Sequence, residues 1–279
     1  MLTFAKTINM DLKDNVIIVT GASSGIGKAI AYELGFKKSK VVLAARRIEK
    51  LKDIEAELKT VGIEVFSCPT DVSKEADCKN LIEKTIERFG TIDVLINNAG
   101  ISMRAMFEDT ELDVLRRVMD VNFWGTVMCT KYAMPYLTKA KGTVIGVSSV
   151  AGYRGLPGRT GYSASKFAMH GFLESLRTEH YNTGVNVLLI CPGFTASEIR
   201  ETALIADGSQ QGKSPKEETK MMTAEEVAKE VIKSIENNTR DKVLTRQGKM
   251  TVMVNKLLPS FMDKMVFNHF KKEEDSPIK

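Results

Sequence analysis

The feature of this sequence that most limits its fold is a regular alternation of short apolar runs with longer helical patterns. The apolar runs, rich in Val and Ile, lie at residues 15–20, 40–45, 64–68, 93–96, 143–147, 185–190 and 242–245. A strand that is apolar along its whole length is buried on both faces, which is typical of a parallel sheet. We therefore predict an α/β fold in which helices cover both faces of one parallel sheet.

Amphipathic helical patterns separate these runs. They lie at residues 24–35, 48–60, 75–89, 111–137 and 162–181, and helicity resumes after Thr223. Right-handed strand–helix–strand crossovers then give the doubly wound, Rossmann-type architecture. The 279 residues suit one large domain, residues 1–279, with a core at about 12–245.

The pattern becomes less regular after the sixth run. Residues 194–222 contain a polar Gly- and Lys-rich stretch, which we interpret as a mobile substrate lid, with a disordered loop as the alternative. Thr223 is the expected N-cap of the next helix, with Glu225 and Glu226 in its first turn. Residues 246–279 form a helical extension with apolar residues at helical spacing from Val254, interrupted by Pro259.

This extension is rich in methionine, at Met250, Met253, Met262 and Met265. Such residues suit a cover for an apolar substrate, a subunit contact or a peripheral membrane contact, and ordinary core packing is the simplest alternative. The sequence leaves these alternatives open.

Composition disfavours several classes of protein. A net charge of +5, spread along the chain, disfavours nucleic-acid binding. No run reaches the roughly 20 apolar residues of a transmembrane helix, and we expect a cytoplasmic protein. The four cysteines and three histidines have no metal-ligand spacing, so no metal site is predicted.

A glycine-rich turn, TGASSGIG at residues 20–27, joins the first strand to the first helix. Gly21, Gly25 and Gly27 allow a tight turn and a close approach of the backbone to a pyrophosphate, while the helix N-terminus offers free N–H groups. The spacing is GxxxGxG, so the motif differs from GxGxxG. Its place between a first strand and a first helix predicts nucleotide binding.

The end of the second strand bears on which dinucleotide is bound. Ala45 stands where an acidic residue would select NAD, and Arg46 and Arg47 follow it. The guanidinium of Arg46 suits a ribose 2′-phosphate, and Ser23 and Ser24 add hydroxyl donors, so we predict NADP(H) as the cofactor. The alternative is that both arginines are solvated residues at the start of a helix.

Six motifs in order now resemble the short-chain dehydrogenase/reductase family. They are TGASSGIG at 20–27, NNAG at 97–100, Asn122, VSS at 147–149, YSASK at 162–166 and CPG at 191–193. The resemblance covers about residues 12–245, and no core motif position is replaced. It implies NAD(P)-dependent hydride transfer on one dinucleotide-binding domain, and a homodimer or homotetramer.

The resemblance also implies roles for individual residues. The implied catalytic set is Asn122, which helps to hold a proton-relay water, Ser149, Tyr162 and Lys166. The predicted cofactor-binding set is Gly21, Ser23, Ser24, Gly25, Ile26, Gly27, Arg46, Arg47, Asp71, Val72, Asn98, Ala99, Gly100, Tyr162, Lys166, Pro192, Gly193 and Thr195. Within it, Asp71 and Val72 contact the adenine, and the segment from Pro192 to Thr195 receives the carboxamide of the nicotinamide.

These residue types suit reduction of a ketone or aldehyde. Ser149 can stabilise the negative charge that develops on the carbonyl oxygen, and Tyr162 can donate the proton. A free tyrosine has a pKa of about 10, and an ammonium one helical turn away, on Lys166, favours the phenolate. The predicted function is therefore an NADP(H)-dependent carbonyl reductase or alcohol dehydrogenase. The alternative is a non-catalytic NADP(H)-binding regulator on the same fold.

The substrate is not determined by these motifs. We expect Met103, Arg104, Tyr153, Arg154, Leu156 and residues 194–222 around the pocket. Arg104, Arg154 and Arg159 suit an anionic substrate group, but solvent-facing loop arginines are the simpler interpretation. His170 and His180 are expected on the surface or in the core, and Trp124 in packing or at a subunit contact.

Overall fold

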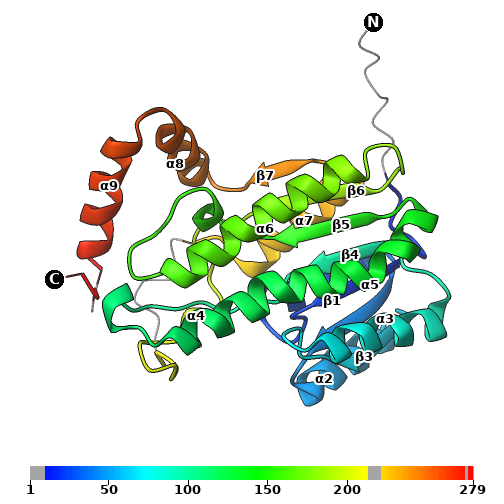
Figure 1. Ribbon diagram of the computed structural model, residues 1–279. Helices are drawn as coiled ribbons and strands as arrows, with labels where there is room; N and C mark the ends of the chain where they lie inside the picture. The colour runs from blue at the N-terminus through cyan, green and yellow to red at the C-terminus, as the bar shows by residue number, and fades with distance from the viewer. Residues whose placement is uncertain (1–9, 213–220, 274–275, 279) are drawn as a thin grey trace, which may run out of the picture.

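The computed structural model describes residues 10–212, 221–273 and 276–278. It contains a seven-stranded parallel sheet in the order β3-β2-β1-β4-β5-β6-β7 (Figure 1). The strands are β1 (Val16–Thr20), β2 (Lys40–Ala45), β3 (Val65–Pro69), β4 (Val94–Asn97), β5 (Thr143–Val147), β6 (Asn186–Cys191) and β7 (Asp241–Val243). The sequence-based prediction of a doubly wound parallel sheet is confirmed.

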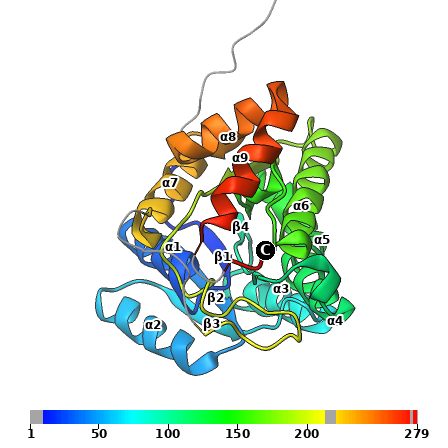
Figure 2. The same cartoon turned by 90° about the vertical axis from the view of Figure 1, so that its left-hand side faces the viewer.

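Two layers of helices sandwich the sheet (Figure 2). One layer contains α1 (Gly25–Phe36), α2 (Ile48–Thr60) and α7 (Ala224–Glu236), and the other contains α3 (Glu75–Phe89), α5 (Gly125–Ala140) and α6 (Thr160–Glu179). Successive strand residues serve opposite layers: Ile17 packs with the first layer and Ile18 with the second. This is why the strands are apolar at every position rather than at alternate ones.

The long helix predicted at residues 111–137 is divided in the structure. It consists of α4 (Leu112–Met119), a π-helical turn (Asp120–Trp124) and α5, which continues to Ala140. A π turn inserts an extra residue into a helix, and such turns occur frequently at functional sites. This one turns Asn122 fully inward, a detail that helical periodicity alone does not predict.

Thr223 is the N-cap of α7, as the sequence predicts. Thr223 Oγ1 accepts a hydrogen bond from the Glu226 amide, and the Glu226 carboxylate accepts one from the Thr223 amide, which is a complete capping box. Helix α8 (Arg246–Leu257) then begins earlier than the pattern from Val254 suggested. Pro259 separates it from α9 (Pro259–Lys271), because proline suits the first turn of a helix but not its interior.

The described part of the segment predicted to be a lid is attached to the rest of the fold. Thr195 pairs with Met222, and Leu204 pairs with Met103 through isolated β-bridges. Residues 213–220 of the predicted lid lie outside the described residues. A lid role for 194–222 stays a prediction.

Candidate active site

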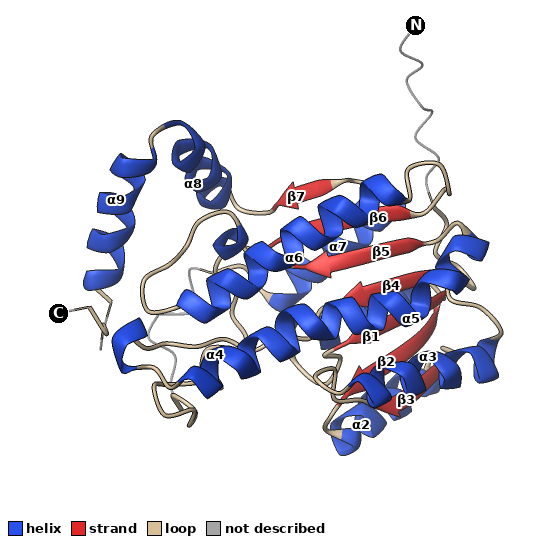
Figure 3. Cartoon of the chain, in the orientation of Figure 1, coloured by secondary structure: helices blue, strands red, loops and turns tan. Residues whose placement is uncertain are grey.

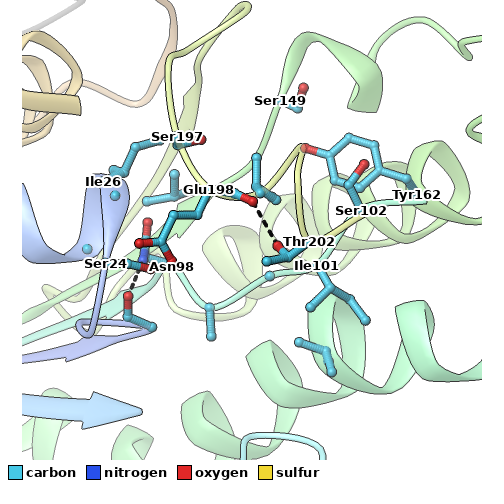
Figure 4. A pocket seen from close by; sticks show the side chains of 18 of the residues that line it. Ser24, Ile26, Asn98, Ile101, Ser102, Ser149, Tyr162, Ser197, Glu198 and Thr202 are labelled. Carbon is cyan, nitrogen blue, oxygen red and sulfur yellow. Dashed lines mark hydrogen bonds between the residues drawn. The ribbon is translucent and has the colours of Figure 1, made fainter. Parts of the chain in front are cut away.

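The parallel strands all point toward the same edge of the sheet (Figure 3). A cavity of about 630 Å³ lies at these carboxyl ends. Residues from the glycine-rich turn, the β2 end, the β4 and β5 ends and α6 all line it. Figure 4 shows Ser24, Asn98, Ser149 and Tyr162 around the same space. Ligands bind at this edge in open α/β sheets, where the strand order reverses.

The glycine-rich turn has the geometry that its sequence predicts. Gly21 has a φ of +67°, and a Cβ there would lie 2.8 Å from the Ala99 Cα. A Cβ at Gly27 would lie 2.2 Å from the Gly21 carbonyl oxygen. The Asn98 side-chain amide donates to the Thr20 carbonyl oxygen at 2.9 Å, which ties this turn to the β4 end. Only glycine fits at both positions, and the turn opens into α1 as a phosphate-binding turn requires.

A cluster of cationic and hydroxyl groups lies beside the glycine-rich turn. Arg47 donates to the hydroxyls of Ser23 and Ser24 at 3.1 and 3.0 Å. Glu198, from the predicted lid, lies 3.4 Å from Arg47 and 3.6 Å from Lys50. The cluster therefore already holds one anionic group of the chain itself, and Lys50 is a member that the sequence motifs did not indicate.

The remaining predicted cofactor residues also border this cavity. They are Gly25, Ile26, Arg46, Asp71, Val72, Ala99, Gly100, Pro192, Gly193 and Thr195. Asp71 accepts hydrogen bonds from the amide and hydroxyl of Ser73, at 3.1 and 2.7 Å, so its carboxylate orders the loop after β3. The structure thus brings the predicted cofactor set together around one cavity.

Ser149 and Tyr162 lie at the β5 and α6 side of the cavity. Burial raises the pKa of Tyr162, while a hydrogen bond with Ser149 and the charges of Arg159 and Arg200 act in the opposite direction. A hydroxyl that is buried beside a hydroxyl partner and two guanidiniums suits proton transfer to and from a bound oxygen.

Lys166 lies one helical turn after Tyr162 and is only 3% exposed. Its Nζ donates to the Val147 carbonyl oxygen at 3.0 Å and lies 5.8 Å from the centroid of the Tyr162 ring. Burial lowers the pKa of Lys166 to about 8. The ammonium is therefore held at the β5 end beside the cavity, close to the Tyr162 ring.

Asn122 does not line the cavity but holds its wall in place. Its side-chain oxygen accepts from the Ile101 amide at 2.8 Å, and its side-chain nitrogen donates to the Ile101 carbonyl and to Ser165 Oγ, each at 2.9 Å. A Cβ on Gly100 would lie 3.2 Å from the Asn122 amide oxygen. Asn122 thus joins the π turn, the loop after β4 and α6; a role in a proton relay stays a prediction.

The three arginines expected near the pocket mouth have different environments. Arg104 is buried and pairs with Glu273 at 3.5 Å, and Arg154 pairs with Asp263 at 2.5 Å on α9. Neither lines the cavity itself, because each is paired with an acid of the C-terminal part. Burial and the charge of Arg104 still lower the pKa of Arg159, so a place near the pocket mouth stays a prediction for these two arginines. Arg159 does line the cavity, 3.4 Å from Ser102 Oγ.

Two further expected pocket residues, Met103 and Tyr153, are likewise absent from the cavity wall, whereas Leu156 lines it. Met103 belongs to a small buried cluster, and Tyr153 packs edge-on against His170. His170 lies 2.7 Å from Ser148 Oγ, and burial lowers its pKa to about 4. His170 is thus a partly buried histidine that contacts Ser148 and Tyr153. Arg200, a cavity residue that no motif indicated, comes from the predicted lid.

The described residues contain neither a metal site nor a membrane-spanning helix. Within 10–212, 221–273 and 276–278, no group of three His, Cys, Asp or Glu side chains is placed to bind a metal. Across the same residues, no helix is both long enough and apolar enough to cross a bilayer.

The chain is similar to a known protein family and to several of its members. The family model "short chain dehydrogenase" matches residues 15–206. A sesame (Sesamum indicum) protein, "11-beta-hydroxysteroid dehydrogenase A", is 39% identical over 193 residues, which cover 68% of this chain and 55% of that protein. The mouse (Mus musculus) "Dehydrogenase/reductase SDR family member 7B" is 32% identical over 271 residues, which cover 95% of this chain and 84% of that one.

Solved structures agree with these matches. An alcohol dehydrogenase from the archaeon Thermococcus sibiricus, complexed with 5-hydroxy-NADP, is 26% identical with a TM-score of 0.74 and covers 82% of this chain and 95% of its own. A short-chain dehydrogenase/reductase from Burkholderia phymatum, in complex with NAD, has the same fold at 23% identity and a TM-score of 0.80, over 90% of this chain and 96% of its own. The sequence motifs, the doubly wound sheet and these matches lead to one conclusion: the chain belongs to the short-chain dehydrogenase/reductase family of oxidoreductases.

Proposed function

We propose that this protein is an NADP(H)-dependent oxidoreductase that interconverts a ketone or aldehyde and the corresponding alcohol. One observation carries the proposal: Ser149, Tyr162 and Lys166 border the same cavity as the glycine-rich turn. A non-catalytic nucleotide-binding protein has no chemical need for all three groups in this cavity.

The residues divide the work of the reaction. A bound nicotinamide would supply or accept the hydride. The Ser149 hydroxyl donates a hydrogen bond to the carbonyl oxygen as negative charge develops there, and Tyr162 transfers its proton to that oxygen. Arg159 and Arg200 stabilise the phenolate that remains, because both charges lower the pKa of Tyr162. In the reverse direction the phenolate removes the proton of the alcohol.

NADP(H) rather than NAD(H) is proposed because of the charges at the end of β2. Arg46, Arg47 and Lys50 follow this strand, whereas an acid that would accept bonds from a ribose 2′-hydroxyl is missing from it. Arg47 and Lys50 already attract the carboxylate of Glu198. A 2′-phosphate carries more charge than a carboxylate and suits the same cluster better.

Part of the cavity lining favours an apolar substrate. Leu156, Phe194 and Leu204 are among the residues that line the cavity. Leu156 and Phe194 also pack against an apolar cluster that contains Met262, Val266 and Phe270 of α9. Several relatives are named as hydroxysteroid dehydrogenases. We therefore propose a lipophilic ketone or secondary alcohol of steroid-like size as the substrate class.

A substrate panel tests the proposal. Oxidation of NADPH and of NADH is followed at 340 nm with steroid ketones, aliphatic and aromatic aldehydes, and small polar ketones. We expect turnover of the lipophilic ketones with NADPH and much slower turnover with NADH. Binding of NADPH without turnover of any compound would instead favour the non-catalytic alternative.

A further inference from the structure

Helices α8 and α9 carry an apolar surface that faces solvent. Half of the large apolar side chains that are exposed in the described residues lie within residues 250–267. Leu257 is 69% exposed and Phe261 is 55% exposed. A contiguous group of this kind marks a surface that contacts another molecule or a membrane, because scattered single residues are the normal pattern.

The exposed residues follow helical spacing, so they form a face on each helix. On α8 they are Met250, Met253 and Leu257, and on α9 they are Phe261 and Met265. Leu258, between the helices, is 58% exposed as well. We call these six residues the α8–α9 surface.

This surface is distinct from the face by which α9 packs on the protein. Met262, Val266 and Phe270, one turn apart, are buried in a cluster with Leu156 and Phe194. Helix α9 is therefore apolar on two sides, and the core uses only one of them. The second side needs another explanation than core packing.

The charges around the α8–α9 surface are strongly basic. Residues 246–271 contain the five exposed basic side chains Arg246, Lys249, Lys256, Lys264 and Lys271. The one acidic residue in this range is Asp263, which pairs with Arg154 at 2.5 Å. The formal net charge of residues 246–271 is +4, and that of the whole chain of 279 residues is +5.

We propose that the α8–α9 surface binds the surface of a bilayer that contains anionic phospholipid. Exposed Met, Leu and Phe side chains insert at the level of the headgroups, while lysines reach the lipid phosphates and carboxylates. A two-fold contact between copies of this surface would bring +4 against +4, so charge disfavours a second copy as the occupant. Since no described helix is suited to cross a bilayer, the two helices lie along it.

The position of the helices agrees with such a contact. Figures 1 and 2 show α8 and α9 at the periphery of the molecule, with α9 at the end toward which the strands point. Leu156 and Phe194, which line the cavity, pack on the inner face of α9. A bilayer against the outer side of α9 therefore lies one helix away from the apolar end of the cavity.

Co-sedimentation of the full chain with vesicles tests this proposal and needs no activity. We expect binding to vesicles of phosphatidylcholine with 30% phosphatidylserine, much weaker binding to pure phosphatidylcholine, and release from the anionic vesicles by high salt. The double variant Phe261→Ser/Met265→Ser should bind at least tenfold more weakly. The double variant Lys264→Glu/Lys271→Glu should also bind the anionic vesicles more weakly, by about fivefold or more for each lysine that is replaced.

Matched control variants lie on other helices. Phe36→Ser removes a 78% exposed phenylalanine from α1, and Lys79→Glu/Lys131→Glu reverses two exposed lysines on α3 and α5. Both controls should bind vesicles as the unchanged protein does, and circular dichroism confirms that each variant is folded.

Three results would overturn the proposal. They are no binding to the anionic vesicles, equal loss of binding in the controls, or a sedimentation-velocity dimer that Phe261→Ser/Met265→Ser dissociates in a protein that does not bind vesicles. The last result would assign the surface to a second copy. None of the three bears on NADPH-dependent turnover, so the proposed function stands or fails separately.

Discussion

At the scale of single residues, Tyr162 is the group whose removal separates chemistry from binding. Tyr162 lines the cavity, and its hydroxyl is buried near Ser149, Arg159 and Arg200. We predict that Tyr162→Phe lowers kcat by about a hundredfold or more and changes the Kd of NADPH by less than about threefold, since the loss of a general acid alone accounts for about 10²–10⁴. Steady-state rates and fluorescence titration measure the two effects. Retained turnover would remove Tyr162 from the mechanism.

Lys166 gives a pH-dependent prediction. Burial depresses its pKa from 10.5 to about 8 in the folded protein. Between pH 8 and 10.5 the lysine is protonated in the unfolded chain and neutral in the folded protein. The buried ammonium therefore lowers the free energy of unfolding by its full amount below pH 8, and this loss of stability disappears as the pH rises toward 10.5. Compared with Lys166→Met, the unchanged protein should therefore gain unfolding free energy over this window, on the order of 2–3 kcal/mol. Urea unfolding of both proteins at pH 7, 8, 9 and 10 measures the difference; a constant difference would contradict the prediction.

At the scale of elements, the predicted lid and the end of β2 are joined by one ion-pair cluster. Glu198 pairs with Arg47 and Lys50, and these side chains are about half exposed. A 2′-phosphate at this cluster would compete with the carboxylate. We predict that Glu198→Gln strengthens NADPH binding by up to about fivefold, since exposed ion pairs contribute at most about 1 kcal/mol, and leaves NADH binding unchanged.

The control for this variant lies in the same segment. Glu201→Gln removes an exposed carboxylate of the segment that has no ion pair in the structure among the described residues. It should leave the Kd of both cofactors unchanged.

Arg47→Ala should have the opposite effect to Glu198→Gln and weaken NADPH binding more than NADH binding. Equal losses would argue against a 2′-phosphate contact.

At the scale of the whole molecule, the layer of α5 and α6 exposes aromatic side chains. Trp124 is 49% exposed and Phe167 is 47% exposed, on the π turn and on α6, which pack against each other. We predict that the protein is a homodimer or homotetramer that associates through this layer, and that Trp124→Ser weakens association at least tenfold, since tryptophan is enriched among interface hot spots. Sedimentation equilibrium measures it; Tyr181→Ser, at an 83% exposed position, is the control and should have no effect.

The sequence by itself determined the sheet, the order of its elements and the composition of most of the site. Strands buried on both faces must be apolar at every position, and turns such as that at Gly21 accept only glycine, so both leave local signals. Tyr162 and Lys166 belong to one helix, and their relation follows from helical geometry alone. For these features, the residue types within one short segment already carry the signal.

Only the tertiary structure decided which charges face the cavity. Arg104 and Arg154 are held away from it by Glu273 and Asp263, more than a hundred residues later in the chain, while Arg200 joins it from the segment predicted as a lid. Both sides of α9 carry Met and Phe side chains, and among the described residues only the side with Met262, Val266 and Phe270 is buried against other segments. An arginine or a methionine looks the same in sequence whether it is paired, buried or exposed. Its role depends on contacts between distant segments, and these exist only once the whole chain has packed.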